Sequence, residues 1–328
     1  MNVAVAAGYA DSVWPFLAML GLVAVVGLTA TAIVFVWTAR LMHRPPRLTP
    51  PRALGRLGRS SPADLGIAFE DWSCELPDVS DRASRLHTPA WWCPLPGPMA
   101  CKRTVVLLHA YGDARSGALA WARLWLDAGF NVLLPDLRAH GEAGGDFTGA
   151  GVWEVDDVRA LLAELKLSQP QLAETVVLAG ISFGGMVAAE VARRDSNVAG
   201  VVVDSPITNW TDAAERFAEL VGLPLPGLTS LRVRWMSRRL GVDLNQCNTA
   251  STLKDIAVPC LLILPEHDTL VPFADELAEA ATGEVWRPAT GHNLAIVDES
   301  DAYREHLEQF AAQIRATSTP TRPMTRGD

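Results

Sequence analysis

From residue 104 onward, short apolar runs alternate with longer segments that repeat apolar residues at helical spacing. Short apolar runs of this kind are typical of buried strands, and the segments between them are long enough for helices. The pattern predicts strands at 104–109, 131–135, 175–180, 199–204, 259–264 and 284–288, and helices at 116–128, 152–166, 184–194, 273–281 and 300–314. Two earlier strands, at 67–76 and 90–93, are expected to begin the sheet in antiparallel fashion. This alternation indicates an α/β fold with a mostly parallel, doubly wound sheet and helices on both faces.

Residues 207–255 interrupt the alternation between two of the predicted strands. Two amphipathic helices are expected in this insertion, at 211–221 and 229–240, with a Gly- and Pro-rich stretch between them. An insertion at this point predicts a short helical cap. Four arginines crowd its second helix, namely Arg232, Arg234, Arg238 and Arg239. They form either a solvated basic face or a contact with anionic lipid headgroups or an acidic substrate.

An apolar run without any charged side chain extends from residue 12 to residue 39. A helix of this length can cross a hydrocarbon layer of about 30 Å. Trp14 and Trp37 stand near its ends, where indole rings favour the membrane interface. The alternative is a cleaved signal peptide, which needs a basic segment before a shorter apolar run, whereas Asp11 is the charged side chain found here. The pattern therefore predicts one retained transmembrane helix, with membrane contact through residues 13–39.

Basic residues follow the apolar run. They are Arg40, Arg44, Arg47, Arg52, Arg56 and Arg59. Because basic flanks stay on the cytoplasmic side of a membrane, the following domain is expected in the cytoplasm. The predicted organisation is an anchor at 1–42, a stiff Pro- and Arg-rich linker at 43–65, an α/β domain at 66–315 with its cap at about 207–255, and a disordered tail at 316–328.

Composition excludes several classes of protein. The chain of 328 residues suits one large α/β domain with an appendage. Its net charge of −9 argues against a general nucleic-acid binder, so no nucleic-acid partner is expected. The cysteines, Cys74, Cys93, Cys101, Cys247 and Cys260, lack C-x-x-C spacing, which argues against a disulfide framework and a structural zinc site. A dinucleotide fingerprint and a P-loop motif are both absent from the sequence, and neither a cofactor nor a metal is expected.

The pentad at 180–184 has the sequence Gly-Ile-Ser-Phe-Gly and lies between a predicted strand and a predicted helix. In this context G-x-S-x-G is typical of a nucleophile elbow, in which a strained turn lifts the serine hydroxyl clear of the sheet. Gly180 and Gly184 are required if the two backbones pass too close for a Cβ. The alternative is that Ser182 is an ordinary polar residue in a βα turn.

Two residues that could activate Ser182 follow it in the order Asp, then His. Asp268 comes just after the strand at 259–264, and His292 comes just after the strand at 284–288. Because the carboxyl ends of parallel strands meet at one edge of a sheet, these side chains are expected to converge on Ser182. A serine hydroxyl needs a base, and a carboxylate fixes the tautomer of that base. Asp204 and, less favourably, Glu266 are reserve acids; a helix N-cap at Asp268 and a surface loop at His292 are the non-catalytic alternatives.

These residues make the chain resemble the alpha/beta-hydrolase superfamily over about residues 66–315. The segment 104–112 resembles the family's strand and H-G-x-x-G oxyanion loop, with Ala110 where the family usually has Gly. The resemblance implies that the backbone N–H groups of Tyr111 and Phe183 are the oxyanion donors, each worth about 3 kcal/mol. It is closest to serine hydrolases with a short cap and a single N-terminal membrane helix, which include esterases, thioesterases and peptidase-like members.

A second segment, 134–142, resembles the family's D-x-R-G-H-G-x-S stretch, with Ala139 in place of a Gly. It is either a plain βα loop or, less favourably, a metal site built from Asp136, His140 and Glu142.

The expected function is hydrolysis of a carboxylic ester or thioester through an acyl-enzyme, with a small-molecule acyl substrate that could be a lipid. The alternatives are a peptidase-like amide hydrolase and a non-catalytic membrane-anchored interaction protein on the same scaffold. Apolar residues of the cap predict a medium or long acyl chain, unless they simply pack the cap onto the sheet. They are Trp210, Phe217, Leu220, Leu223, Leu225, Leu228, Trp235 and Met236.

Overall fold

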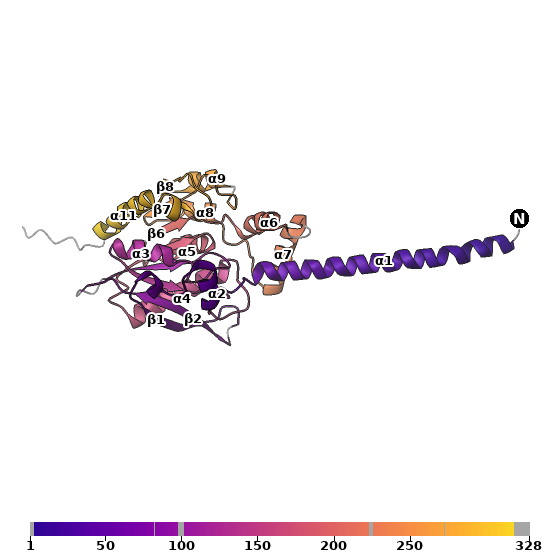
Figure 1. Ribbon diagram of the computed structural model, residues 1–328, viewed down its shortest axis with the longest axis horizontal. Coiled ribbons are helices and arrows are strands. Elements are labelled where there is room, and N and C mark those ends of the chain that lie inside the picture. Colours follow the sequence, from indigo (N-terminus) through magenta and orange to yellow (C-terminus); the bar gives the residue numbers. More distant parts are fainter. Residues whose placement is uncertain (1–2, 82, 98–101, 223–225, 272, 318–328) are drawn as a thin grey trace, which may run out of the picture.

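The computed structural model describes residues 3–81, 83–97, 102–222, 226–271 and 273–317. A single eight-stranded sheet runs through the domain in the order β1-β2-β4-β3-β5-β6-β7-β8 (Figure 1). The strands are β1 (Glu70–Pro77), β2 (Arg85–Cys93), β3 (Arg103–Leu108), β4 (Asn131–Pro135), β5 (Thr175–Ile181), β6 (Val198–Asp204), β7 (Cys260–Ile263) and β8 (Glu284–Trp286). The predicted tail from residue 318, together with Cys101, Leu223 and Leu225, lies outside the described residues.

The prediction of a mostly parallel sheet is confirmed. β1 pairs antiparallel with β2, and β2 pairs antiparallel with β4, whereas every neighbouring pair from β4 to β8 is parallel. β4, β5 and β7 are buried at every position. Strands covered on both faces have near-continuous apolar sequences, which is why short unbroken runs marked them so clearly.

Helices cover both faces of the sheet and divide the core into two parts. α3 (Leu119–Asp127), α10 (Ala295–Asp298) and α11 (Ser300–Thr317) pack on one face, where Trp125 and Phe310 are among the largest buried side chains. The opposite face carries α4 (Val152–Ser168), α5 (Phe183–Arg194), α8 (Thr249–Lys254) and α9 (Ala274–Ala280). Alternate residues of β3 serve the two parts, since Val106 contacts one and Leu107 the other.

The cap consists of α6 (Trp210–Leu220), the short η2 (Pro226–Leu228) and α7 (Thr229–Leu240), as the insertion predicts. Asn209 begins α6, and its side chain accepts the backbone N–H of Asp212 (3.0 Å). α8 follows the cap and was not predicted, because six residues are too few to show a helical period. Asn248 caps it in the same way, so an Asn at a possible N-cap position was the available signal.

The apolar N-terminal helix α1 (Val3–His43) projects from the domain as a single rod (Figure 1). Its length and composition over Trp14–His43 are sufficient to cross a membrane. Along the rod the side chains are exposed, with Leu28 72% accessible, but Thr38, Ala39 and His43 are fully buried at its carboxyl end. The end of α1 is therefore packed into the domain.

The segment predicted as a stiff linker, 43–65, contains α2 (Pro50–Leu57) and the short helix η1 (Pro62–Leu65) and lies against the domain. A proline in the first turn of α2 and a left-handed Gly58 after it begin and end that helix. Arg47 donates to the backbone carbonyls of Ala143 (2.5 Å) and Gly145 (2.6 Å). Composition predicted a stiff linker, and in the structure these tertiary bonds hold the segment against the domain.

A buried arginine joins the loop after β4 to two other elements. The Arg138 side chain has no exposed surface; it donates through Nε and Nη2 to both carboxylate oxygens of Asp157 (2.7 and 2.8 Å) and through Nη1 to Asp78 (2.8 Å). The carboxylate of Asp78 is held by Arg138 and Ser80, which lower its pKa to about 2 against the opposing effect of burial. Arg138 thereby links the residue that follows β1 to α4.

Replacing Arg138 by Met is expected to lower the free energy of unfolding by about 3–5 kcal/mol, because two carboxylates would remain buried without their cation. Urea unfolding followed by circular dichroism measures it. Arg159→Met on α4 is the matched control, since Arg159 lies 3.9 Å from Asp156 in an exposed pair and should change stability by less than about 1 kcal/mol. Equal effects of the two substitutions would contradict the role of the buried network.

Candidate active site

Ser182 occupies a strained turn between β5 and α5. Its φ of 55° and ψ of −113° are unfavourable for a residue with a side chain. A Cβ on Gly180 would lie 2.1 Å from the carbonyl oxygen of Gly184, and a Cβ on Gly184 would lie 2.4 Å from that of Leu108. The two glycines are therefore required by close backbone approach, which is the reason that the sequence pattern implied.

The structure brings Asp268 and His292 to Ser182 at the carboxyl edge of the sheet. The His292 Nε2 atom lies 3.0 Å from Ser182 Oγ, and its Nδ1 atom lies 2.6 Å from Asp268 Oδ2. Asp268 Oδ1 accepts the backbone N–H groups of Leu270 (2.8 Å) and Val271 (3.0 Å), so the carboxylate cannot rotate freely. A proton on Nδ1 bonds to the carboxylate, which leaves Nε2 free to accept the serine proton.

Asp204, the reserve acid, is buried and does not belong to this chain of hydrogen bonds. Its carboxylate accepts Tyr303 Oη (2.9 Å), Trp121 Nε1 (3.3 Å) and Ser205 Oγ (2.8 Å), and it makes no bond to the histidine. Burial raises the pKa of Asp204, and those hydrogen bonds oppose the rise. The second reserve, Glu266, is exposed.

Asp204 nevertheless supports the site through the backbone. Its carbonyl oxygen accepts the N–H of Ser182 (2.8 Å), and the hydroxyl of the adjacent Ser205 accepts the N–H of Asn293 (3.2 Å). The adjacent residues Asp204 and Ser205 therefore hold the turn at Ser182 and the loop at His292 in fixed relative positions. The sequence contained no local signal for these bonds.

The two residues implied as oxyanion donors lie next to each other. Phe183 begins α5, so its backbone N–H has no acceptor within the helix. The Tyr111 ring contacts the Phe183 ring edge-on at 6.2 Å, which places the loop after β3 beside the nucleophile turn. Gly112 takes a left-handed φ of 69°, whereas the alanine at 110 is not among the residues with positive φ. The Ala for Gly exchange at 110 therefore does not strain the loop.

The alternative metal site after β4 is occupied by protein partners. Arg115 donates to both Asp136 and Glu142, and His140 stacks on Phe183 with ring centroids 5.9 Å apart. Within the described part of the chain, no group of three His, Cys, Asp or Glu side chains is arranged to hold a metal ion. Ala139 takes a left-handed φ of 62° at the position where the resembling family has Gly.

The sequence profile of the alpha/beta hydrolase family matches residues 105–306. The chain belongs to the alpha/beta-hydrolase family. Over 221 residues it is 24% identical to the uncharacterized protein YqkD of Bacillus subtilis (strain 168), an alignment that covers 65% of this chain and 72% of YqkD.

Two solved structures of similar fold come from an esterase and a peptidase. The esterase Pf2001 of Pyrococcus furiosus has a TM-score of 0.64 and 23% identity, covering 83% of this chain and 97% of that one. The proline iminopeptidase of Mycobacterium smegmatis has a TM-score of 0.54 and 18% identity, covering 76% of this chain and 100% of that one. At these identities the likeness shows a shared fold.

In this alpha/beta hydrolase the end of α1 contacts Tyr111 and Trp210, two side chains that pack on the Phe183 ring. The Tyr111 hydroxyl donates to the backbone carbonyl of Met42 (2.9 Å), and Trp210 Nε1 donates to Nε2 of the buried His43 (2.9 Å). Trp210 in turn contacts the Tyr111 ring (5.3 Å) and the Phe183 ring (5.8 Å). Sequence reasoning missed these contacts, because only the folded chain brings residue 43 to the oxyanion loop.

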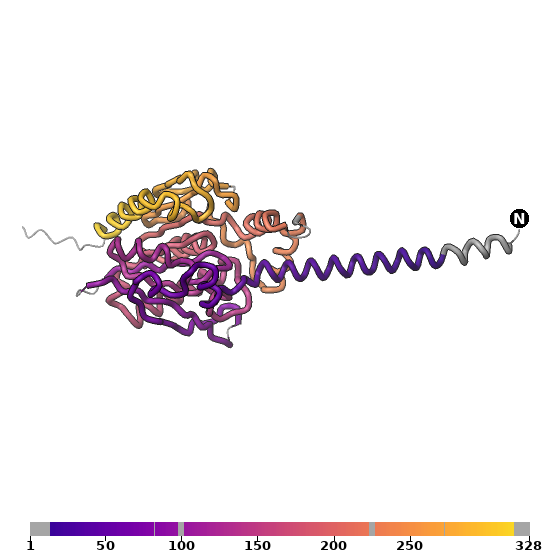
Figure 2. Tube along the Cα trace, viewed as in Figure 1, coloured from indigo at the N-terminus to yellow at the C-terminus, as the bar shows by residue number. Residues whose placement is uncertain are grey.

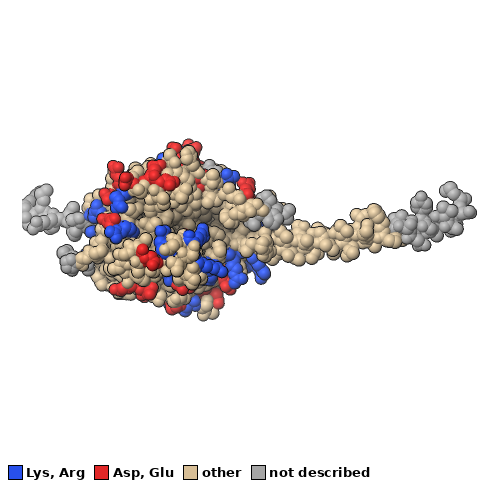
Figure 3. Space-filling model, in the orientation of Figure 1, with Lys and Arg blue, Asp and Glu red and all other residues tan. Residues whose placement is uncertain are grey.

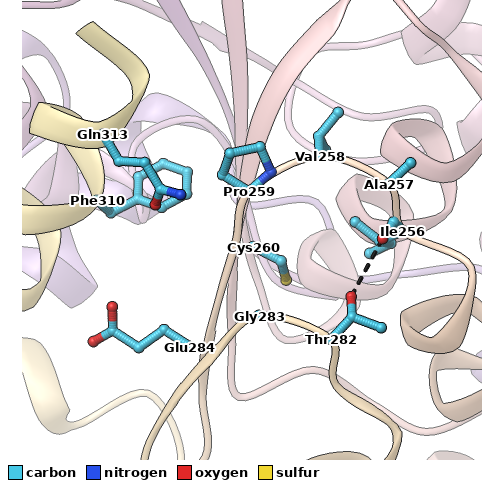
Figure 4. Close-up of a pocket in the computed structure, with 10 residues that line it drawn as sticks. All are labelled: Ile256, Ala257, Val258, Pro259, Cys260, Thr282, Gly283, Glu284, Phe310 and Gln313. Atoms are coloured by element: carbon cyan, nitrogen blue, oxygen red, sulfur yellow. Dashed lines mark hydrogen bonds between the residues drawn. The ribbon is translucent and has the colours of Figure 1, made fainter. Parts of the chain in front are cut away.

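A surface cavity of about 380 Å³ lies at the opposite edge of the sheet, at the amino ends of β7 and β8. Figure 4 shows Cys260 and Thr282 on its strand side and Phe310 and Gln313 reaching from α11. Burial raises the pKa of the Cys260 thiol to about 12, so it is not a nucleophile at neutral pH. Ser182, Asp268 and His292 are not among the residues that line this cavity.

Proposed function

We propose that the protein is a serine hydrolase that cleaves carboxylic esters or thioesters, with Ser182 as nucleophile, His292 as base and Asp268 as the acid that orients it. One observation carries the proposal: the unbroken hydrogen-bond chain from Asp268 to His292 (2.6 Å) and from His292 to Ser182 (3.0 Å), ending on a strained elbow. A neutral serine is a weak nucleophile, and this arrangement supplies the base that it lacks.

The reaction follows from the positions of the protons. Ser182 Oγ transfers its proton to His292 Nε2 as it attacks the acyl carbon, and Asp268 stabilises the resulting imidazolium. The imidazolium then protonates the departing alcohol or thiol, leaving an acyl-enzyme on Ser182. A water molecule then attacks the acyl carbon and gives a proton to His292, and His292 donates that proton to Ser182 Oγ as the acyl C–O bond breaks, which releases the acid and restores the serine hydroxyl.

The backbone N–H groups of Tyr111 and Phe183 are proposed to bind the oxyanion of the tetrahedral intermediates. Phe183 offers an N–H at a helix N-terminus, where the helix dipole also favours negative charge. Such donors stabilise the charge that develops in the transition state more than the neutral carbonyl of the substrate.

Amide hydrolysis uses the same side chains, and a non-catalytic protein could retain them. Labelling of Ser182 by a fluorophosphonate, located by mass spectrometry, separates an enzyme from an inert scaffold. Rates on an ester, a thioester and an anilide that share one acyl group then separate the reaction types. A faster rate on the anilide would favour the peptidase-like alternative.

Ser182→Ala is expected to lower kcat by about 10⁴-fold or more, and Asp268→Asn by a comparable factor, because the amide favours the wrong histidine tautomer. Steady-state hydrolysis of a p-nitrophenyl ester measures both, with thermal unfolding to check the fold. Asp204→Asn is the matched control and should retain much more activity, since Asp204 does not contact His292. If Asp204→Asn were the more damaging change, the acid would be misassigned.

The substrate is proposed to carry a medium or long apolar acyl chain. Trp210, which is 5% exposed, supports this because its ring lies against Phe183 beside the nucleophile. Trp210 and Met236 both belong to the buried core, so the packing alternative applies to both, and what distinguishes Trp210 is its contact with the Phe183 ring. Phe217 and Leu220 are about half exposed and point away from the core.

The ratio kcat/KM should rise from acetyl to octanoyl esters by up to about fourfold per methylene, the equivalent of about 0.8 kcal/mol, and then level off. Trp210→Ala should flatten this rise. The control, Trp235→Ala, should preserve it, because Trp235 packs on Phe35 of α1 at 6.1 Å. A chain-length profile that is flat in the unsubstituted enzyme would remove the apolar-acyl proposal.

We also propose that α1 is retained as a single-pass membrane anchor with the hydrolase domain in the cytoplasm. The bonds from Tyr111 to Met42 and from Trp210 to His43 support retention, because cleavage of a signal peptide would remove their partners. The arginines after the apolar run support the orientation.

A reporter fused after residue 328 tests the orientation. Green fluorescent protein should be fluorescent there, and alkaline phosphatase, which needs an oxidising compartment, should be inactive. Reporter activity with the opposite pattern would place the domain outside the cytoplasm. The mass of the purified chain shows whether α1 has been removed.

A further inference from the structure

The outer end of the cap exposes large apolar side chains. Phe217, Leu220 and Val221 at the end of α6 are 48%, 51% and 51% exposed, and Leu231 in the first turn of α7 is 42% exposed. These four residues are called the cap tip below. Single exposed apolar residues are ordinary, but a group at the end of one helical hairpin marks an interaction surface.

The cap tip lies beside the anchor helix. The Trp235 ring of α7 contacts the Phe35 ring of α1 edge-on at 6.1 Å, and the Arg232 guanidinium lies over the same ring at 5.8 Å. Figures 1 and 2 show the α6–α7 hairpin on the side of the domain from which α1 leaves. Leu231 lies about one turn before Trp235, which places it about 6 Å closer to the N-terminal end of α7.

The side chains of α1 locate the membrane surface relative to the cap. Ile33 is 63% exposed and belongs to the apolar run, Trp37 is 56% exposed, and Arg40 is the first charged residue after it. An indole ring followed by an arginine is typical of the boundary between acyl chains and headgroups. Because Trp235 contacts Phe35, α7 reaches the depth of that boundary.

Basic side chains surround this region. Arg44 at the start of the docked segment and Arg234, Arg238 and Arg239 on α7 are exposed. Figure 3 shows basic side chains gathered on the surface where α1 leaves the domain. Arginines of this kind keep their charge among headgroups while their stems lie on apolar surface, and each is attracted to an anionic membrane surface.

We propose that the cap tip is a membrane-docking surface: Phe217, Leu220, Val221 and Leu231 enter the acyl–headgroup boundary of the same bilayer that α1 spans. The occupant is phospholipid, since the surface is continuous with the apolar anchor and edged by arginines. Docking places the two ends of α6 in different surroundings, because Trp210 contacts Tyr111 and Phe183 while Leu220 lies in lipid. An acyl ester dissolved in the bilayer can then reach Ser182 along α6, a consequence that rests on the proposed function.

Depth-dependent quenching in the full-length chain tests the docking. The Leu220→Cys variant is labelled with bimane and reconstituted in phosphatidylcholine vesicles containing phosphatidylglycerol and a lipid spin-labelled near its headgroup. Its emission should shift to the blue and lose most of its intensity. The matched control is bimane at Leu167→Cys: Leu167 is 79% exposed near the end of α4, which leads to the opposite edge of the sheet. The unsubstituted chain, treated identically, corrects for its own cysteines.

Equal quenching at residues 220 and 167 would overturn the proposal. A blue shift at 220 that depends on protein concentration and not on spin-labelled lipid would also overturn it, because a second copy of the chain would then cover the cap tip. Neither result depends on catalysis, so the measurement can be made with Ser182→Ala. In the active enzyme, Leu220→Glu should lower the rate on a vesicle-borne ester relative to a water-soluble ester, whereas Leu167→Glu should leave that ratio unchanged.

Discussion

The close approach of α5 to the ends of β5 and β3 is the constraint on which the rest of the site depends. The carbonyl oxygens of Gly184 and Leu108 stand where Cβ atoms of Gly180 and Gly184 would be, so only glycine permits the turn. The turn forces Ser182 into a left-handed φ, and its N–H is held by the carbonyl of Asp204. The strain is maintained by a sheet that is buried on both faces, and the hydroxyl is thereby presented at the edge where the other loops end.

Two buried carboxylates beside the nucleophile have different tasks because their surroundings differ. Asp268 is oriented by backbone N–H groups of its own loop and leaves one oxygen for His292. The Asp204 carboxylate accepts hydrogen bonds from Tyr303, Trp121 and Ser205, and Asp204 contacts the site through its backbone atoms. The first arrangement favours one tautomer of His292. The second holds the turn at Ser182 and the loop at Asn293 at a fixed distance from each other.

The long apolar helix α1 and the hydrolase domain are one structural unit at their junction. The last turn of α1 is buried, and its carbonyl groups and His43 accept hydrogen bonds from Tyr111 and Trp210, which also line the proposed oxyanion and acyl sites. A displacement of α1 would therefore be transmitted to the edge that carries Ser182 through two side chains. In the proposed membrane-docked arrangement, the cap tip would extend the same contact outward, so that attachment and substrate access would involve the same hairpin.

The sequence alone determined that the sheet is mostly parallel and that a tight turn between a strand and a helix carries Ser182. It also placed Ser182, Asp268 and His292 at one edge of the sheet. These follow from local information, since apolar runs mark buried strands and parallel strands share a carboxyl edge. Which of Asp204 and Asp268 is hydrogen-bonded to His292, the docking of 43–65 on the domain and the burial of His43 against Trp210 were decided only by the tertiary structure. Each depends on a contact between residues far apart in the chain, and neither hydrophobic period nor composition records which distant carbonyl or carboxylate a side chain will meet.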